Sequence, residues 1–255
     1  MIIDTHAYLS RWPFRRLAGD EPSEFTARMR EQGVGQAWVG SFDGLLHKDV
    51  AAVNARLAAD CRAHAAGLQL IAFGSVNPAL PDWQEDLRRC REQHRMPGIR
   101  LHPNYHGYTL ADPRFTEVLR LAARQGLIVQ LVVTMEDERT QHPLMQVPSV
   151  DLGPLAGIVP AIPSLRLIVL NQNHYAPVKK IAEAGQVYFD FAMVERVRGV
   201  ATLARQISPE RVVFGSHFPL FYVESAALKM REAGLKDEDS QAIREGNARR
   251  LLDGR

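Results

Sequence analysis

The chain alternates short apolar runs with longer segments in which apolar residues recur at helical spacing. The short runs have the length and the bounding turn residues of strands, and the longer segments have the period of amphipathic helices. In residues 49–65, for example, Val50, Val53 and Leu57 fall on one helix face. The predicted strands are residues 1–4, 36–39, 68–76, 98–101, 127–133, 165–170, 187–191 and 212–214.

Eight strands that alternate with helices over 255 residues predict an α/β protein with a distorted (β/α)8 TIM barrel. We interpret residues 1–255 as one domain. A doubly wound open sheet is the alternative, but it usually has fewer strands, and no GxGxxG or GxxxxGK motif follows a predicted strand. Residues 134–163 contain several prolines, so only short helices are expected there.

Composition narrows the class of partner. A net charge of +2 without a block of Lys or Arg argues against a nucleic-acid partner. No apolar run is long enough to span a bilayer, and the first residues lack a secretory signal pattern. Cys61 and Cys90 have no CxxC partner, so both are expected to be reduced thiols. We therefore expect a cytoplasmic protein that binds a small molecule and neither nucleic acid nor membrane.

Candidate chemistry comes from histidines that lie at or after the ends of predicted strands. They are His6, His102, His142, His174 and His217. In a parallel barrel, the loops that follow the strands open on one face, so these side chains are expected to converge there. Imidazole is a common metal ligand and the usual general acid or base near neutral pH. The pattern predicts an active site at the C-terminal mouth of a barrel.

Three segments carry a family resemblance: IDTHAY at residues 3–8, GIRLHP at 98–103 and RVVFGSHFP at 211–219. In this order and spacing they resemble the amidohydrolase superfamily, and specifically its amidohydrolase-2 branch, which includes enzymes similar to aminocarboxymuconate-semialdehyde decarboxylase. The resemblance implies a distorted TIM barrel with one or two divalent metals at its mouth. The usual ligands are a His-x-His pair after strand one, histidines after strands five and six, and an aspartate after strand eight.

This sequence departs from the family pattern at most of those positions. Tyr8 replaces the second histidine of the pair, Thr134 ends strand five where a histidine is usual, and His217 stands in place of the aspartate. The metal set expected from the resemblance is therefore His6, His142, His174 and His217. Zinc is the first choice of ion, and a site without metal is the alternative.

The remaining polar residues at strand ends suggest roles in catalysis and binding. His217, His6 and Tyr8 are the predicted catalytic group. The predicted substrate-binding residues are Arg100, His102, Asn171 and Asn173, because guanidinium and amide groups suit a carboxylate or another polar substrate group. A structural alternative for Arg100 is an ion pair with a buried carboxylate such as Asp4 or Asp190.

The leading hypothesis is a hydrolase of the amidohydrolase type that cleaves a C–N or C–O bond of a small acidic or cyclic substrate. A lactonase that works without metal is one alternative, and a decarboxylase is another, because the resembled branch contains decarboxylases. A barrel that binds a ligand without turnover is the alternative from another class. Family members are often oligomers, so a homo-oligomer is left open, and the sequence shows no interface signature.

Overall fold

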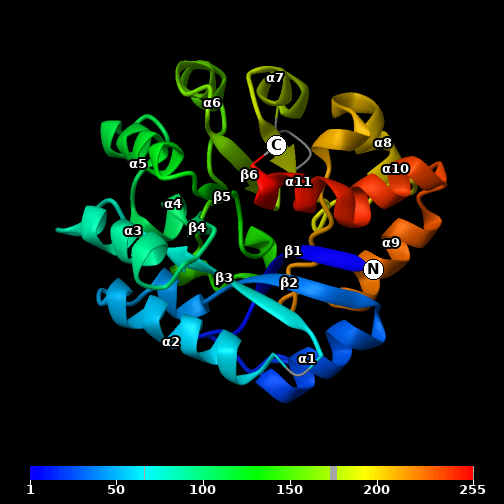
Figure 1. Ribbon diagram of the computed structural model, residues 1–255, viewed down its shortest axis with the longest axis horizontal. Coiled ribbons are helices and arrows are strands. Elements are labelled where there is room, and N and C mark those ends of the chain that lie inside the picture. The colour runs from blue at the N-terminus through cyan, green and yellow to red at the C-terminus, as the bar shows by residue number, and fades with distance from the viewer. Residues whose placement is uncertain (66, 173–176, 255) are drawn as a thin grey trace.

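The computed structural model describes residues 1–65, 67–172 and 177–254. Its strands form one parallel sheet of seven in sequence order, and helices surround this sheet on the outside (Figure 1). The strands are β1 (Ile2–Tyr8), β2 (Val34–Gly40), β3 (Gln69–Ser75), β4 (Gly98–Leu101), β5 (Ile128–Val132), β6 (Arg166–Leu170) and β7 (Val187–Phe189).

The longer helices follow the strands as a barrel requires. They are α1 (Pro22–Glu31), α2 (Val50–Ala63), α3 (Trp83–Glu92), α5 (Pro113–Arg124), α7 (Val178–Glu183), α8 (Gly199–Ile207), α9 (Val223–Glu232), α10 (Asp237–Gln241) and α11 (Asn247–Asp253). Short turns of helix include η1 (Phe42–Leu45), α4 (Pro103–His106), η2 (Glu138–Thr140), η3 (Pro143–Met145), α6 (Leu155–Ile158), η4 (Val159–Ala161), η5 (Pro209–Arg211) and the π-helix η6 (Ala242–Gly246). The prolines of residues 134–163 keep the helices there short, as predicted.

An extended segment closes the barrel where an eighth strand was predicted. The amide of Val213 donates to the Phe189 carbonyl (2.9 Å) on one side, and the amide of Thr5 donates to the Phe214 carbonyl (2.8 Å) on the other. Further along, the His217 amide donates to the His6 carbonyl at 2.7 Å. Only isolated parallel bridges form on this segment, so it closes the barrel without becoming a regular strand. The predicted distorted TIM barrel is confirmed.

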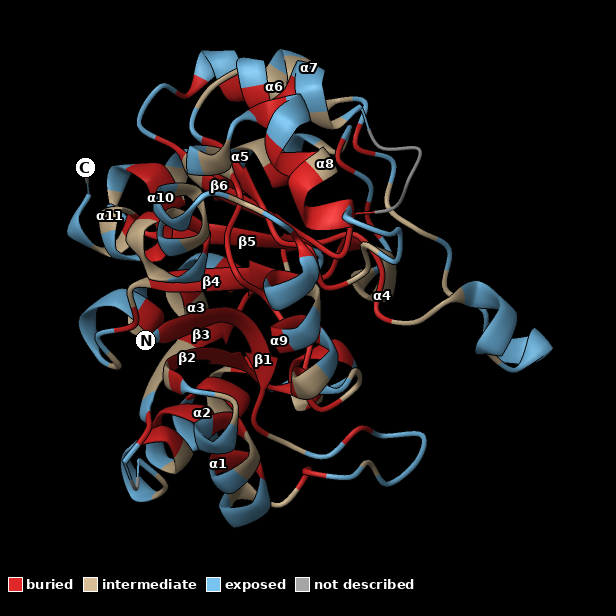
Figure 2. Ribbon diagram, turned by 90° about the vertical axis from the view of Figure 1, so that its right-hand side faces the viewer, coloured by how far each residue is buried: buried red, intermediate tan, exposed pale blue. Residues whose placement is uncertain are grey.

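The C-terminal helix covers the N-terminal ends of the strands. Ala248 and Leu251 are buried against Ile128, Ile168 and Val213. Nearby, the Arg166 guanidinium donates to the Leu251 carbonyl. The strands and inward helix faces are buried, whereas the outer turns of the helices are exposed (Figure 2). With one end of the barrel filled by apolar side chains, the opposite end is left for polar groups.

Two local predictions were wrong. The first strand runs to Tyr8 instead of ending at Asp4, because Asp4 and Thr5 both find buried hydrogen-bond partners; His6 and Tyr8 therefore lie inside β1. The sequence DWQE at residues 82–85 predicts a capping box formed by Asp82 and Glu85, but Asp82 adopts a left-handed conformation (φ 58°) and its side chain makes no capping bond. Within the described residues, no helix combines the length and apolar character needed to cross a membrane.

Candidate active site

Polar side chains gather at the C-terminal ends of the strands and are fully or almost fully buried. His6 and Tyr8 come from the end of β1, His102 follows β4, and Asn171 follows β6. Asp190 follows β7, and His217 lies in the closing segment. A buried polar group must find partners to offset its lost hydration, so the contacts among these residues show how the site is built.

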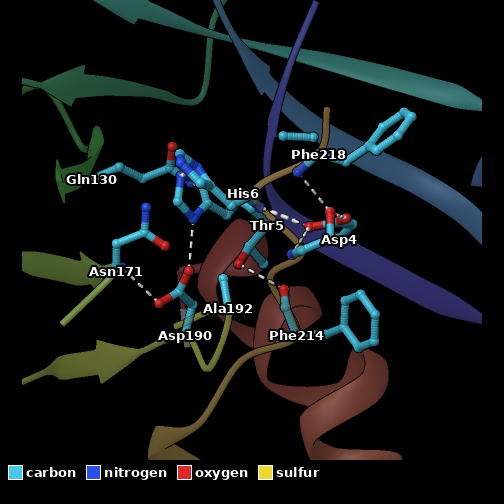
Figure 3. Close-up of polar contacts among 12 residues, drawn as sticks. Asp4, Thr5, His6, Gln130, Asn171, Asp190, Ala192, Phe214 and Phe218 are labelled. Atoms are coloured by element: carbon cyan, nitrogen blue, oxygen red, sulfur yellow. Dashed lines mark hydrogen bonds and ion pairs between the residues drawn. The ribbon is translucent and has the colours of Figure 1, made fainter. Parts of the chain in front are cut away.

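A continuous chain of hydrogen bonds links three of these residues. His6 Nδ1 lies 2.6 Å from Asp190 Oδ2, and His6 Nε2 lies 2.9 Å from His217 Nδ1. His217 Nε2 ends the chain 2.8 Å from the carbonyl oxygen of Met135. Figure 3 shows His6 pointing at Asp190, with Asn171 on the far side of the carboxyl group. We call the set Asp190–His6–His217 the relay.

Backbone geometry fixes both ends of the relay. Asp190 Oδ1 accepts the Asn171 amide proton at 2.8 Å, which fixes the rotation of the carboxyl group. Both Asn171 (φ 53°) and His217 (φ 59°) adopt the left-handed conformation, which is uncommon for residues other than glycine. Such strained residues persist where the surrounding contacts enforce them, and they cluster at functional sites.

Gly215 lets the closing segment approach the relay. A Cβ at this position would lie 2.9 Å from Asp190 Oδ2 and 3.0 Å from the Cβ of His6. No side chain fits there unless Asp190 or the closing segment shifts. The sequence GSH at residues 215–217 therefore supplies the relay histidine His217 and, at Gly215, the lack of a side chain that lets Asp190 and His6 lie close to this segment.

Burial shifts the pKa values of the relay so that all its members tend to be uncharged. Loss of hydration raises the pKa of Asp190 to about 7, although the hydrogen bond from Asn171 lowers it. The same burial holds the pKa values of His6 and His217 well below 6.5, with Arg100 and neighbouring imidazoles adding to the effect. The 2.6 Å contact between Asp190 Oδ2 and His6 Nδ1 requires one proton, which the two groups share.

Asp4 joins β1 to the closing segment below the relay. Its carboxyl group accepts the amide protons of His6 (2.9 Å) and Ser216 (3.1 Å) and the hydroxyl proton of Ser216. Burial raises the pKa of Asp4 to about 7, while these hydrogen bonds lower it. Asp4 therefore positions the backbone of both relay histidines.

Arg100 is fully buried, and three of the five N–H groups of its guanidinium bond to protein oxygen atoms. Its guanidinium donates to Gln130 Oε1 (2.8 Å) and to the carbonyls of Ala7 (2.7 Å) and Trp38 (3.1 Å). It also lies 4.5 Å from the centre of the Tyr8 ring. The role in holding a substrate carboxylate stays a prediction, because two N–H groups remain beyond these contacts, whereas the alternative ion pair with Asp4 or Asp190 does not form. Arg100 instead joins four strands and leaves its charge at the centre of the mouth.

Tyr8 and His102 form a second polar contact beside the relay. The Tyr8 hydroxyl lies 3.0 Å from His102 Nε2 and 3.4 Å from the Met135 sulfur. Its ring stacks on Phe42 at 4.3 Å. Burial raises the pKa of Tyr8 to about 12 and holds that of His102 well below 6.5. His102 Nδ1 is buried and has no hydrogen-bond partner in the protein.

The structure places the remaining predicted residues differently. Asn171 is buried at the mouth, where its Nδ2 donates to the Thr134 carbonyl (2.8 Å) and its Oδ1 has no protein partner. Asn173 and His174 lie outside the described residues. His142 is exposed, and its Nδ1 accepts the Leu144 amide proton at 3.2 Å. The structure therefore does not bring His142 together with the buried His6 and His217.

The predicted metal set is not assembled by the residues that the structure describes. Among them, no group of three or more His, Cys, Asp or Glu side chains converges in a way that could hold a metal ion. His6 and His217 do meet, but they bond to each other.

Two residues of the site, Gln130 and Met135, were missed as members of it. Gln130, like Asp190, is an isolated polar residue in or next to an apolar strand sequence; this signal makes a site role for Asp190 plausible from the sequence and could have identified Gln130 as well. Met135 contributes its backbone carbonyl and a sulfur atom, and no sequence pattern identifies such a contact.

Comparison with known proteins assigns the chain to a family. A family model described as amidohydrolase matches residues 3–254. The chain belongs to this amidohydrolase family. A search of curated proteins found no match to the sequence.

Solved structures share the fold of this amidohydrolase at low sequence identity. A 5-carboxyvanillate decarboxylase from Sphingomonas paucimobilis has a TM-score of 0.77 and 13% identity, over 99% of this chain and 98% of that one. A 2,6-dihydroxybenzoate decarboxylase from Rhizobium has a TM-score of 0.75 at 13% identity, covering 99% and 98%. A dihydroxybenzoic acid decarboxylase from Polaromonas sp. JS666, with bound manganese and 2-nitroresorcinol, has a TM-score of 0.78 at 13% identity, covering 99% and 96%.

Proposed function

We propose that this amidohydrolase is a decarboxylase that acts on a small aromatic or cyclic carboxylic acid. The observation that carries the proposal is the buried relay at the barrel mouth, because decarboxylation of such an acid needs a proton at the carbon that loses CO2. The similar folds named above belong to decarboxylases of aromatic acids, which supports this reaction over hydrolysis of a C–N bond.

A divalent metal is a candidate cofactor, because similar folds are found with bound manganese, and its ligands would have to come from these residues. A catalytic metal needs about three protein ligands with free lone pairs. Here only His6 Nε2 and His217 Nδ1 face each other, and the Tyr8 hydroxyl is engaged by His102 and Met135. The described residues therefore do not fit a manganese or zinc ion, and no step of the proposed reaction is assigned to one.

In the proposed reaction, His217 delivers the proton. Its Nε2 proton leaves the Met135 carbonyl and bonds to the ring carbon that carries the carboxylate. His217 Nδ1 takes the Nε2 proton of His6, and His6 Nδ1 takes the proton held by Asp190. The carbon–carbon bond then breaks, its electron pair returns to the ring, and CO2 leaves. A proton from water restores the relay, so the sum is carboxylate plus proton to arene plus CO2.

In this proposal, His217 is the catalytic residue, and His6 and Asp190 supply its proton. Tyr8 and His102 lie beside it and are assigned to substrate hydroxyl or carboxylate groups through the open Nδ1 of His102. Arg100 attracts an anionic substrate mainly by its charge, because three of its five N–H groups bond to protein oxygen atoms.

Hydrolysis of a lactone is a second candidate, and the absence of a metal-ligand set among the described residues favours it. That reaction would need the relay in the form that has lost one proton, with Asp190 ionised and Nε2 of His217 unprotonated, so that Nε2 can take a proton from the attacking water. The two reactions have different products: a decarboxylase releases CO2, whereas a lactonase releases a new carboxylate.

The test is a substrate screen with hydroxybenzoic acids, pyrone and furan carboxylic acids, and small lactones. We expect CO2 release from at least one acid, and deuterium at the vacated carbon when the reaction runs in D2O. His217→Gln should lower kcat by about 100-fold or more, the usual share of a general acid. His47→Gln removes an exposed histidine and serves as the matched control.

Ring opening of lactones without CO2 release would replace this proposal by the second candidate. Saturable binding of the same acids without any turnover would instead favour a ligand-binding barrel.

A further inference from the structure

The Met135 carbonyl, at the His217 end of the relay, determines where the protons of the relay lie. A backbone carbonyl carries no proton, so the contact of 2.8 Å between His217 Nε2 and the Met135 carbonyl requires the proton to be on Nε2. A neutral imidazole then has a lone pair on its other nitrogen. His217 Nδ1 is therefore an acceptor; the assignment combines the partner of Nε2 with a neutral ring, in line with the lowered pKa of this buried histidine.

The same reasoning extends to His6. Its Nε2 lies 2.9 Å from the His217 Nδ1 lone pair, so His6 Nε2 must donate. His6 Nδ1 faces Asp190 Oδ2 at 2.6 Å, and one proton lies between them. The other Asp190 oxygen accepts the Asn171 amide proton at 2.8 Å. Every ring nitrogen of both histidines is thus used within the protein.

We infer that a proton chain from Asp190 through His6 and His217 to the Met135 carbonyl takes the place of a divalent metal in this barrel. A ring nitrogen that carries a proton cannot coordinate an ion, because coordination needs its lone pair. A metal between the two rings would have to expel the proton that joins them.

The surroundings favour the proton chain over an ion. No third ligand from the described residues points at the space between the rings, since the Tyr8 hydroxyl is held by His102 Nε2 and the Met135 sulfur. The Arg100 guanidinium is already buried against the Tyr8 ring, 4.5 Å from its centre, and brings a positive charge to the same region. A dication there would meet like charge in a medium of low dielectric constant.

The inference is tested by metal binding and by the histidine NMR spectrum, neither of which depends on turnover. The full chain is stripped with chelator, incubated with MnCl2 or ZnCl2, desalted, and analysed for metal by elemental mass spectrometry. We expect no stoichiometric metal and no shift in Tm with either ion. In 15N-histidine spectra, the rings of His6 and His217 should both carry their proton on Nε2, before and after Mn2+ is added.

One stoichiometric Mn2+ or Zn2+ that is retained by the wild type and by His47→Gln, but lost in His217→Gln, would overturn the inference. A lone pair on Nε2 of either ring in the wild-type NMR spectrum would also overturn it, and this measurement does not require a folded variant.

The inference rests on the same residues as the proposed decarboxylase, but the two fail separately. Decarboxylation that needs a bound, stoichiometric metal would remove the inference and keep the function. Absence of metal with no turnover of any acid or lactone would keep the inference and remove the function.

Discussion

At the scale of single residues, the site depends on how closely Asp190, His6 and His217 approach one another. The contacts of 2.6 Å and 2.9 Å exist because Gly215 has no side chain and because Asn171 and His217 accept a left-handed backbone. A substitution that moves these three side chains slightly apart should therefore slow proton transfer as much as the loss of one of their polar groups.

Gly215→Ala tests this dependence without removing any polar group. The new methyl group would lie 2.9 Å from Asp190 Oδ2, so the carboxyl group or the closing segment must shift. We expect kcat to fall at least tenfold, with a destabilisation of about 1–3 kcal/mol from overpacking. Steady-state kinetics and urea unfolding measure the two effects. Unchanged kcat in a folded Gly215→Ala protein would show that the relay distance does not matter.

His102 should make the protein less stable in acid. Burial holds its pKa well below 6.5, so below pH 6.5 the unfolded chain binds a proton that the folded chain does not. The free energy of unfolding therefore falls as the pH drops through this range. His6 and His217 act in the same direction, whereas Asp4 and Asp190, with pKa values raised to about 7, act in the opposite one.

His102→Gln isolates the contribution of one imidazole. Relative to wild type, its loss of stability between pH 7 and pH 5 should be smaller by up to about 2 kcal/mol, the linkage value for one histidine. Urea unfolding at both pH values measures it. Equal pH dependence in the two proteins would contradict a neutral, buried His102.

At the scale of elements, Arg100 holds β1, β2, β4 and β5 together at the mouth. The sequence located this arginine at a strand end, and it was predicted to bind a substrate. In the structure, its partners are two backbone carbonyls and the Gln130 amide oxygen. Partners of this kind depend on the register of neighbouring strands, which the sequence of one strand does not reveal.

Arg100→Lys should destabilise the protein by about 3 kcal/mol, because an ammonium group cannot reach all three acceptors and leaves buried oxygen atoms unpaired. Arg88→Lys on the surface of α3 is the control, since exposed ion pairs contribute about 0–1 kcal/mol. Urea unfolding compares the two. A cost for Arg100→Lys no larger than the control would mean that Arg100 does not join the strands.

The alternation of strands and helices could be predicted from the sequence, whereas the residues at which the strands end could not. Apolar periodicity located every strand of the sheet, and the buried β5 is an example. The length of β1 was underestimated because Asp4, Thr5 and His6 are polar, yet they pair with groups far away in the sequence.

At the scale of the whole molecule, the two ends of the barrel have separate tasks. The C-terminal helix fills one end with apolar side chains, and the relay occupies the other. The histidines at strand ends predicted which end carries chemistry. The sequence could not predict that His6 and His217 bond to each other, because their contact joins the first strand to the segment that closes the barrel.

Leu251→Ala tests this separation. Leu251 is fully buried at the end away from the relay, so its loss should cost about 3 kcal/mol of stability while kcat stays within about twofold. Leu252→Ala, at a half-buried neighbour, should cost less. A large loss of kcat in folded Leu251→Ala would show that the two ends are coupled.

The most direct test of the central claim is CO2 release from hydroxybenzoic and related ring carboxylic acids by the chelator-treated protein. We predict that turnover persists without metal and falls by about 100-fold or more in His217→Gln. Turnover that is lost on chelation and restored by Mn2+, or that survives in His217→Gln, would contradict a relay that works in place of a metal.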